Sequence, residues 1–479
     1  MSISSIENNK LLQDNIDRIL KEVKDAQTQL YEDMVSYDEV INIFNIIKKY
    51  IKENKRKIYG GYALNELIKQ KDPSKEIYTY YDKNTFDAEN IRDIDIYSPD
   101  PIYDFVNICN LLHKAGITFI LAHESVHIET YSIKVKDTEY CNISYVPKNI
   151  YNKLPYQEID GYVYIHPQVI MIDMLRIFTS PLNSYWRLKK DIYSRFLLLE
   201  QFYPLPIINK PLNNFKHSKL GNKALEVISK YLINRESCIL TGFYMYNCYT
   251  YVNKLDNYIN IPYYEIISFE YRSDVLDLLD VLKATISPDK IKIEEYYPFF
   301  QFIDYSANIY IDNELVVKIY NNGKKCTPYI KTVSLVNNEG EILEGNIYIA
   351  TFQLACLYIL INIIKARVNN QDKTPLYILL SKIISLRNLY LKNNNKTVFD
   401  KTVFEEFIVH CKGYTISNKL EKKKLIEYRK KSGKRYTIRY DPADKIIKPF
   451  NYIFANSSGN IINNKQNLKV QSNAESDSD

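Results

Sequence analysis

The residues of this chain best suited to metal chemistry lie in the stretch IRDIDIYSP, residues 91–99. Asp93 and Asp95 are two positions apart in a run of isoleucine and tyrosine that is typical of a buried strand. Because a strand alternates its faces, both aspartates are expected on one side while Ile94 and Ile96 point into the core. Neighbouring carboxylates repel each other unless a cation lies between them, and Mg²⁺ or Mn²⁺ prefers such oxygen ligands. We therefore predict a divalent metal site at the two aspartates.

A turn suited to phosphate binding precedes the two acids. Gly60 and Gly61, in RKIYGGYALN, lie where a predicted strand passes into a predicted helix. Glycine lets the backbone approach a phosphate closely, and the first turn of a helix offers free N–H groups to an anion. Such a turn followed by Asp-x-Asp on a second strand is the pattern of a nucleotidyltransferase. There the glycines hold the triphosphate, and the metals activate the attacking hydroxyl and neutralise pyrophosphate. Each motif alone is weak, so the prediction rests on their order and context.

The elements that must position these residues follow from the hydrophobic pattern. Residues 36–54 predict an amphipathic helix that opens with a capping box, Ser36 with Glu39, and residues 98–116 predict a helix that ends at a glycine. Residues 117–146 alternate as strands and contain a hairpin with the polar turn KDTE. This order predicts an α+β fold around a mixed sheet. We also expect a helix at 5–31, a loop at 72–90 and further helices at 168–200.

The second half of the chain echoes the first in three places, in the same order. We therefore predict a duplicated domain, because chance periodicity would not preserve the order. Tyr263 and Glu265 stand where the first copy has its two aspartates, and Thr241 is expected in place of the first glycine. The second copy should keep the scaffold and lack the chemistry. The paired segments are ILTGFYMYN (239–247) with IYGGYALN (58–65), YEIISFEYRSDVLDLLDVL (264–282) with IDIYSPDPIYDFVNICNLL (94–112), and GNIYIATFQLACLYIL (345–360) with GYVYIHPQVIMIDML (161–175).

Composition sets the outer bounds of the function. With 479 residues, 46% hydrophobic and 25% charged, the chain can form two or three soluble domains. A net charge of +6 allows a polyanionic partner only at a local basic surface. The seven cysteines are scattered and lack a C-x-x-C pair, which predicts free thiols in a reducing compartment. We find neither a signal-peptide core nor an apolar run of about 18 residues, and expect an intracellular, soluble protein without a membrane span.

The motifs resemble those of a known family, the catalytic subunit of poxvirus poly(A) polymerase and its mimivirus-like relatives in giant cytoplasmic DNA viruses. YGGYALNELI is similar to the glycine motif, RDIDIYS to the metal motif, and IHPQVIMIDMLRIFTSP to the helix after the catalytic strands. The similarity extends over most of residues 55–400. It implies a polymerase-beta-like nucleotidyltransferase domain followed by an inactive one, in agreement with the degenerate copy. Tyr62, which follows the glycines, is a further candidate for nucleotide contact.

One position departs from the family pattern. The family's third metal-binding aspartate lies on the hairpin strand that here reads YCNISYV, where the resemblance places Asn142. An amide can offer a metal its oxygen but no negative charge. Three explanations stay open: an acid supplied by Asp137 or Glu139 from the adjacent turn, a natural weakening of the site, or an introduced, inactivating Asp→Asn change. The first is the least expected, because turn residues would have to fold back onto the strand face.

Two groups of basic residues are candidates for binding phosphate. Arg187 and Lys190, three apart on a predicted helix, share a face suited to gripping a triphosphate or an RNA backbone, and a solvated face is an equal alternative. Residues 419–439 form the densest basic run and interleave tyrosines, so they could follow an RNA backbone and stack bases. Here too a solvated helix is the alternative. The candidates in this run are Lys422, Lys423, Lys424, Arg429, Lys430, Lys431, Lys434 and Arg435.

The stretch HESVH, from His123 to His127, matches a zinc motif that requires a helix. It lies between segments with strand-like patterns. Residues four apart on a strand are about 13 Å distant, too far for one zinc ion, so we predict no metalloprotease site.

These observations predict a template-independent poly(A) polymerase that adds AMP from ATP to the 3′ end of viral mRNA. Mg²⁺ or Mn²⁺ would be held by Asp93 and Asp95, with Asn142 at the third position. Two alternatives stay open: a non-catalytic RNA-binding subunit that keeps the fold, and a nucleotidyltransferase of CCA-adding or oligoadenylate type. Expected partners are ATP, an RNA 3′ end, and either a second copy of the chain or a separate processivity subunit. The resemblance implies a location in the host cytoplasm, at the viral factory, and in the virion.

The predicted organisation has five parts. They are an N-terminal helical region (1–55), a catalytic domain (56–200), a degenerate copy (201–400), a basic C-terminal region (401–454) and a disordered tail (455–479).

Overall fold

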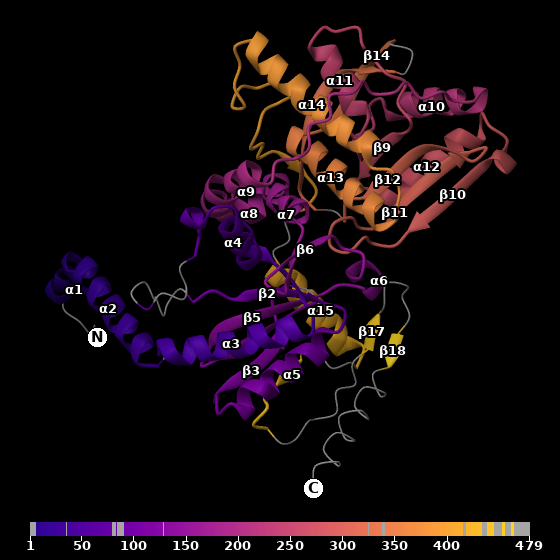
Figure 1. The fold of residues 1–479 in the computed structure, drawn as a ribbon. Helices are drawn as coiled ribbons and strands as arrows, with labels where there is room; N and C mark the ends of the chain where they lie inside the picture. The colour runs from indigo at the N-terminus through magenta and orange to yellow at the C-terminus, as the bar shows by residue number, and fades with distance from the viewer. Residues whose placement is uncertain are drawn as a thin grey trace. The chain divides into compact units, whose positions relative to one another are not determined.

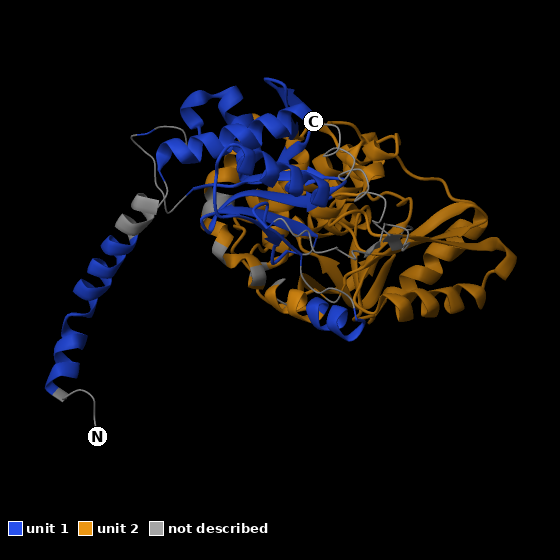
Figure 2. Cartoon of the chain, turned by 90° about the horizontal axis from the view of Figure 1, so that it is seen from below, with its two compact units in different colours: residues 1–145, 157–164, 425–450 blue, residues 146–156, 165–424, 451–479 orange. Residues whose placement is uncertain are grey.

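The chain divides into two compact units in the computed structural model (Figure 2). Unit 1 comprises residues 1–145, 157–164 and 425–450, and unit 2 comprises residues 146–156, 165–424 and 451–479. Each is built on one eight-stranded mixed sheet with helices beside it, which confirms the predicted α+β fold. Residues 146–156 and 165–200 fall in unit 2, and the predicted domain boundaries stay a prediction. The structure describes residues 6–34, 36–78, 83, 91–127, 129–323, 325–337, 341–414, 418–433 and 438–444, and the backbone of 453–455 and 461–463.

The sheet of unit 1 has the strand order β16-β3-β4-β5-β2-β1-β7-β6. Figure 1 labels β2, β3, β5 and β6 of this sheet. β2 pairs antiparallel with β1 and parallel with β5, while β4 pairs antiparallel with both β3 and β5. The predicted hairpin is therefore present as β4 and β5. The strands are β1 (Lys57–Tyr59), β2 (Ile94–Ser98), β3 (Ile120–Glu124), β4 (Thr130–Val135), β5 (Thr138–Tyr145), β6 (Tyr156–Ile159), β7 (Tyr162–Ile165) and β16 (Arg439–Tyr440).

The helices of unit 1 bury the faces that the sequence predicts. α3 (Tyr37–Glu53) places Val40, Ile43, Phe44, Ile47 and Ile51 in the core, and α5 (Pro101–Lys114) ends just before Gly116, whose φ is +83°. Only half of the predicted capping box forms: the Ser36 hydroxyl accepts from the Glu39 backbone N–H, whereas the Glu39 carboxylate accepts from Lys136 at 2.7 Å. The remaining helices are α1 (Ile6–Asp14), α2 (Ile16–Met34), α4 (Gly60–Lys71), the 3₁₀ turn η1 (Pro73–Lys75) and α15 (Asn418–Lys431), whose residues before 425 belong to unit 2.

The helix predicted at 5–31 is wrong in one respect: it is interrupted between α1 and α2. The break falls at Asn15, whose side-chain amide donates to the backbone carbonyl of Leu11 at 2.8 Å. Asparagine side chains compete with the helix for backbone partners in this way, and the hydrophobic period alone does not reveal it. No helix in the described part of the chain is both long and apolar enough to cross a membrane.

The sheet of unit 2 has the order β10-β11-β12-β9-β8-β14-β13-β15 (Figure 1). Its strands are β8 (Cys238–Thr241), β9 (Tyr264–Ser268), β10 (Ile291–Tyr296), β11 (Ser306–Ile311), β12 (Glu314–Asn321), β13 (Thr327–Val336), β14 (Ile342–Ala350) and β15 (Cys411–Lys412). Its helices are α6 (Lys148–Tyr151), α7 (Pro167–Thr179), α8 (Pro181–Ser184), η3 (Tyr185–Arg187), the π-helical η4 (Leu188–Phe196), α9 (Leu197–Phe202), α10 (Lys219–Leu232), α11 (Tyr244–Val252), α12 (Tyr271–Lys283), η5 (Pro288–Lys290), α13 (Phe352–Val368) and α14 (Thr374–Asn393). In the predicted tail, β17 (Ile453–Ala455) pairs with β18 (Ile461–Asn463), and the other residues after 455 lie outside the described residues.

The two sheets share one topology, which confirms the predicted duplication. Strands β3-β4-β5-β2-β1-β7-β6 correspond in order to β10-β11-β12-β9-β8-β14-β13, with one added edge strand in each sheet. Asn65 on α4 and Asn247 on α11 make equivalent hydrogen bonds. The amide oxygen of Asn65 accepts from the backbone N–H groups of Ile77 and Tyr78. The amide oxygen of Asn247 accepts from the backbone N–H of Ile259. The copies therefore agree in side-chain contacts as well as in strand order.

Both copies also contain a buried aspartate on the helix that follows the acid strand. Asp104 of α5 is 0% exposed and accepts from Tyr50 at 2.6 Å and Arg56 at 2.8 Å. Its counterpart Asp274 on α12 is 1% exposed and accepts from Arg235 at 3.0 Å. A buried carboxylate needs such partners, so these acids hold the scaffold together.

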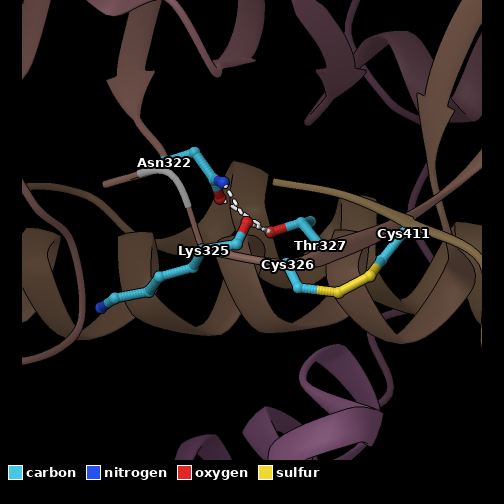
Figure 3. The surroundings of a disulfide bond; sticks show 5 residues. All are labelled: Asn322, Lys325, Cys326, Thr327 and Cys411. Carbon is cyan, nitrogen blue, oxygen red and sulfur yellow. Dashed lines mark hydrogen bonds between the residues drawn. A yellow bond between two sulfur atoms is a disulfide. The ribbon is translucent and has the colours of Figure 1, made fainter. Parts of the chain in front are cut away.

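Two of the seven cysteines are bonded to each other, which corrects the prediction of free thiols for this pair. Cys326 and Cys411 form a disulfide across 85 residues, with Cα atoms 5.3 Å apart (Figure 3). The bond lies where β13 pairs with β15, at Thr327 opposite Lys412. The other five cysteines are free and buried. Sequence spacing could not identify the pair, because only the sheet pairing brings the two residues together.

Candidate active site

The two aspartates lie as the alternation predicts. Ile94 and Ile96 on β2 are 0% exposed, while Asp95 on the same strand and Asp93 directly before it are half-buried. β2 runs parallel to β5, and Asp95 is the direct register partner of Asn142. Two neighbouring strands therefore bring the three predicted ligand residues together.

The electrostatics of this patch favour a cation. The thiol of Cys141, next to Asn142 on β5, is 0% exposed. Burial, followed by the charges of Asp95 and Asp93, raises the pKa of Cys141 well above its usual value. Burial disfavours charge of either sign, so only the part of the shift caused by Asp95 and Asp93 reflects the negative charge of this patch.

The glycine turn lies against the same carboxylate. α4 begins at Gly60, whose φ is +70°, and a Cβ atom at this position would collide with the carboxylate of Asp95. Tyr59 precedes the helix without capping it by a side-chain hydrogen bond, and its ring instead stacks on Tyr97 with centroids 3.9 Å apart. The prediction that the glycines open a helix after a strand is confirmed. Tyr62 is buried, 4% exposed, and its contact with nucleotide stays a prediction, as does phosphate binding at the turn.

Asn142 links the acids of the patch to one another. Its amide nitrogen donates to the carboxylate of Asp93 and, at 2.7 Å, to that of Glu139. Its amide oxygen accepts from the Ser132 hydroxyl at 2.6 Å. Glu139 thus faces the aspartates, although the sequence ranked an acid from this turn as the least expected explanation.

The donor set fits a hard divalent ion. Asp93, Asp95 and Glu139 offer carboxylate oxygens and Asn142 an amide oxygen, which are the ligand types that Mg²⁺ and Mn²⁺ prefer. In the described part of the chain no three His, Cys, Asp or Glu side chains are placed close enough to hold a metal. At this patch the Asn142 nitrogen donates to the carboxylates of both Asp93 and Glu139.

The basic candidates are placed differently from one another. Arg187 ends η3 in unit 2, where it lies near the carboxyl of Asp173, whose pKa is raised mainly by burial and lowered in part by Arg176 and Arg187. The side chain of Lys190 lies outside the described residues. The proposed triphosphate or RNA grip of Arg187 and Lys190 stays a prediction.

In the basic run, one residue is already engaged in the fold. Arg429 on α15 donates to both carboxylate oxygens of Glu124, at 2.9 and 3.2 Å, and Glu124 is 5% exposed. Glu124 belongs to HESVH, and His123 lies beside it on β3, which confirms the predicted strand there. Lys434 and Arg435 lie outside the described residues. On α15, Lys422 is half-buried, and Lys423, Lys424, Lys430 and Lys431 are exposed.

The second copy has different residues at the positions that form the candidate site in the first copy. Glu265 on β9 corresponds to Asp95 and is the register partner of Lys318 on β12, which therefore corresponds to Asn142. Lys318 donates to the Tyr263 hydroxyl at 2.9 Å, and although burial opposes its charge, Tyr263 and Glu265 raise the pKa of Lys318. An ammonium group thus stands where the first copy could hold a metal.

The predicted replacement of the first glycine by Thr241 is wrong. Gly242 has a φ of +68°, and a Cβ there would collide with the Glu265 carboxylate, as at Gly60 in the first copy. The glycine that the second copy lacks is therefore the counterpart of Gly61, which is Phe243. The ring of Phe243 packs on Tyr263, with centroids 5.8 Å apart.

The correspondence of Lys318 to Asn142 was not predicted, although the sequence contains a signal for it. Residues 309–321, IYIDNELVVKIYN, align without a gap to residues 133–145, IKVKDTEYCNISY, at an offset of 318 − 142 = 176. Few residues are identical between these two hairpin segments. Their similarity is therefore recognisable only once the strand order is known.

A duplicated mixed sheet, with carboxylates on adjacent strands beside a glycine turn in one copy only, defines a nucleotidyltransferase-type polymerase fold. The crystal structure of the Megavirus polyadenylate synthase matches this chain with a TM-score of 0.79 at 30% identity, covering 98% of this chain and 94% of that one.

Sequence comparison agrees with the structural match. Residues 45–184 match the family "Poly(A) polymerase catalytic subunit", and residues 199–472 match "APMV, Putative poly(A) polymerase, catalytic subunit, C-terminal". A "Putative poly(A) polymerase catalytic subunit" of Acanthamoeba polyphaga mimivirus is 33% identical, covering 88% of this chain and 76% of the relative. A protein with the same title from African swine fever virus (strain Badajoz 1971 Vero-adapted) is 24% identical, covering 38% of this chain and 37% of its own length.

The chain belongs to the poly(A) polymerase catalytic subunit family of giant viruses. This confirms the family resemblance and the predicted enzyme class, a polynucleotide adenylyltransferase. Enzymes of this family generally use ATP and divalent metals, and the carboxylates of Asp93 and Asp95 are of the chemical type that binds such ions.

Proposed function

We propose that this protein extends the 3′ end of viral mRNA without a template, by transferring AMP from ATP to the terminal 3′-hydroxyl. The observation that carries the proposal is the position of Asp95, which faces Asn142 on the next strand and lies against the Gly60 turn at the start of α4. Metal ligands and a helix N-terminus that can bind phosphate are therefore adjacent. In family members of this type the chemistry needs both at one place.

Each residue of the site has a task in this reaction. The α4 N-terminus, with its backbone N–H groups, binds the phosphates of ATP, and Gly60 allows the Asp95 carboxylate to approach that turn. Asp93 and Asp95 would hold divalent ions, which when bound lower the pKa of the 3′-hydroxyl and neutralise the leaving pyrophosphate. The carboxylates also fix the in-line geometry, because they come from the rigid centre of a sheet.

Extension of a labelled RNA primer with ATP and Mg²⁺ or Mn²⁺ tests the proposal. The wild type is expected to add a tail, and Asp95→Asn, which keeps the side-chain shape, is expected to abolish it. Lack of extension by the wild type, or equal extension by the variant, would refute it. Each of the four nucleotides offered alone separates a poly(A) polymerase from an enzyme of CCA-adding or oligoadenylate type.

The neutral Asn142 favours one second candidate, a non-catalytic subunit that binds RNA on the same fold. RNA binding that needs no metal, together with no extension even after Asn142→Asp, would support this candidate over the enzyme.

For partners, we propose an RNA 3′ end and ATP at the site, with either a second copy of the chain or a separate processivity subunit. Sedimentation of the purified chain distinguishes these two. We also propose that the protein works in the host cytoplasm at the viral factory and is carried in the virion, which imaging of infected cells and analysis of purified virions would test.

A further inference from the structure

A β-bulge in unit 1 decides which side chains face the two aspartates. The pairing of β4 with β5 shifts after Ile133: Lys134 pairs with Glu139, and Tyr140 becomes the extra residue of the bulge. Residues three apart on a regular strand lie on opposite faces, but the extra residue brings Glu139 and Asn142 to the same face. Their hydrogen bond of 2.7 Å is the direct evidence. A turn acid therefore reaches the site without any folding back of the turn.

We propose that Glu139 supplies the third carboxylate of the metal site, in place of the charge that Asn142 lacks; this inference rests on the proposed function. Asp93 and Glu139 both accept from one amide nitrogen. Two hydrogen bonds to a single nitrogen keep the acceptor oxygens within about 5 Å of each other. Two oxygen ligands of one Mg²⁺ or Mn²⁺ lie up to about 4 Å apart, so a small movement lets both carboxylates bind one ion.

Asn142 is then a positioning residue that exchanges its amide nitrogen for its oxygen when a cation enters. The Ser132 hydroxyl, which now donates to the amide oxygen at 2.6 Å, can equally accept a hydrogen bond from the amide nitrogen. A half-turn of the amide therefore keeps that contact and directs the oxygen toward Asp93 and Glu139. The nitrogen holds the acids together until a divalent ion replaces it.

The second copy separates this role from a structural one. It keeps the bulge, at the corresponding shift between β11 and β12. At the offset of 176, Leu315 replaces Glu139 and Lys318 replaces Asn142. The four positions of the first site, two aspartates, Glu139 and Asn142, carry a formal charge of −3, whereas tyrosine, glutamate, leucine and lysine in the second copy sum to zero. The second copy thus has the bulge but neither the acid at the Glu139 position nor the one at the Asp93 position.

Titration of Mn²⁺, followed by the paramagnetic resonance of the free ion and without ATP or RNA, tests the role of Glu139. Glu139→Gln is expected to weaken Mn²⁺ binding about tenfold or more. Asp137→Asn is the matched control: it removes the same charge two residues away on an exposed turn with a φ of +65°, which asparagine tolerates, and should leave binding unchanged. Adding Asn142→Asp to Glu139→Gln should restore binding, which also shows that the variant folds.

The outcomes distinguish this inference from the proposed function. If Glu139→Gln binds Mn²⁺ as the wild type does while Asp95→Asn does not bind it, Glu139 is no ligand and the enzyme proposal stands. If Asp95→Asn also binds Mn²⁺ like the wild type, both proposals fail. Equal losses in Glu139→Gln and Asp137→Asn would likewise overturn the inference, because general surface charge would then explain the effect.

Discussion

Lys318 of the second copy lies opposite a buried glutamate, so replacing it should lower the stability of unit 2 by an amount that can be predicted. Its register partner Glu265 is 1% exposed and accepts from Tyr320 at 3.0 Å and Asn362 at 3.1 Å. Lys318→Met removes the cation that faces Glu265 across the two strands. It leaves this buried carboxylate with its two neutral donors and with the weaker influence of Lys365. Breaking a buried charge pair costs about 3–5 kcal/mol. Because Lys318 is itself half-buried and Glu265 keeps two hydrogen bonds, we expect a loss of about 2–3 kcal/mol in the free energy of unfolding.

Urea denaturation followed by circular dichroism measures this loss. Adding Glu265→Gln to Lys318→Met should recover most of the stability, because the buried carboxylate is then gone. Lys292→Met is the matched control in the same unit, since Lys292 pairs with Glu294 at 2.7 Å on the surface and such pairs contribute about 0–1 kcal/mol. A loss at Lys318 no greater than at Lys292, or one that Glu265→Gln does not reduce, would refute this explanation.

Three further predictions concern stability and RNA binding. In oxidising buffer, Cys411→Ser should lower the free energy of unfolding by about 2–4 kcal/mol relative to the wild type. In reducing buffer the variant and the wild type should be equally stable, and urea denaturation with and without reductant tests both expectations. Burial, followed by Arg367, lowers the pKa of His166 to about 4, so the stability that His166 contributes above pH 6.5 is lost as the pH falls toward 4. His166→Asn can still cap α7 but does not titrate in this range. In thermal melts between these pH values, the variant should therefore lose about 1–2 kcal/mol less stability than the wild type. Arg429→Met should destabilise the fold by about 3 kcal/mol by stranding Glu124, whereas neutralising the exposed lysines of α15 should leave stability intact and reduce the salt dependence of RNA binding in filter assays.

Local rules predicted much of this fold and part of the site. Alternation placed Asp95 opposite Ile94 and Ile96, and the 3.6-residue period gave the buried face of α3. The remaining features depend on how strands pair with one another, which local rules do not describe. The bulge that turns Glu139 toward the site exists only because β5 pairs with β4, and the disulfide of Cys326 depends on β15 reaching β13. The hairpin of β4 and β5 was predicted, but neither the bulge in its register nor the pairing of β15 with β13 follows from a local pattern.

The duplication divides scaffold from chemistry within one chain. Asn65 and Asn247 keep the same hydrogen bonds, and the buried Asp104 is matched by Asp274 with the same kinds of partner. Residues common to both copies are thus those that each fold needs. At the site itself the copies differ: Asp93, Asn142 and Gly61 of the first copy correspond to Tyr263, Lys318 and Phe243 of the second.

This division assigns different roles to two adjacent glycines. Gly60 has its counterpart in Gly242, with the same positive φ and the same carboxylate contact, so its task is conformational. Gly61 is replaced by Phe243, whose ring packs on Tyr263 directly before β9, so the fold does not require a small residue at this position. We therefore expect Gly60→Ala to lower stability because of its φ and the collision with Asp95. Gly61→Ala should fold normally and raise the KM for ATP. Primer extension and urea denaturation of both variants test this, and equal effects on stability would show that the two copies do not separate the roles.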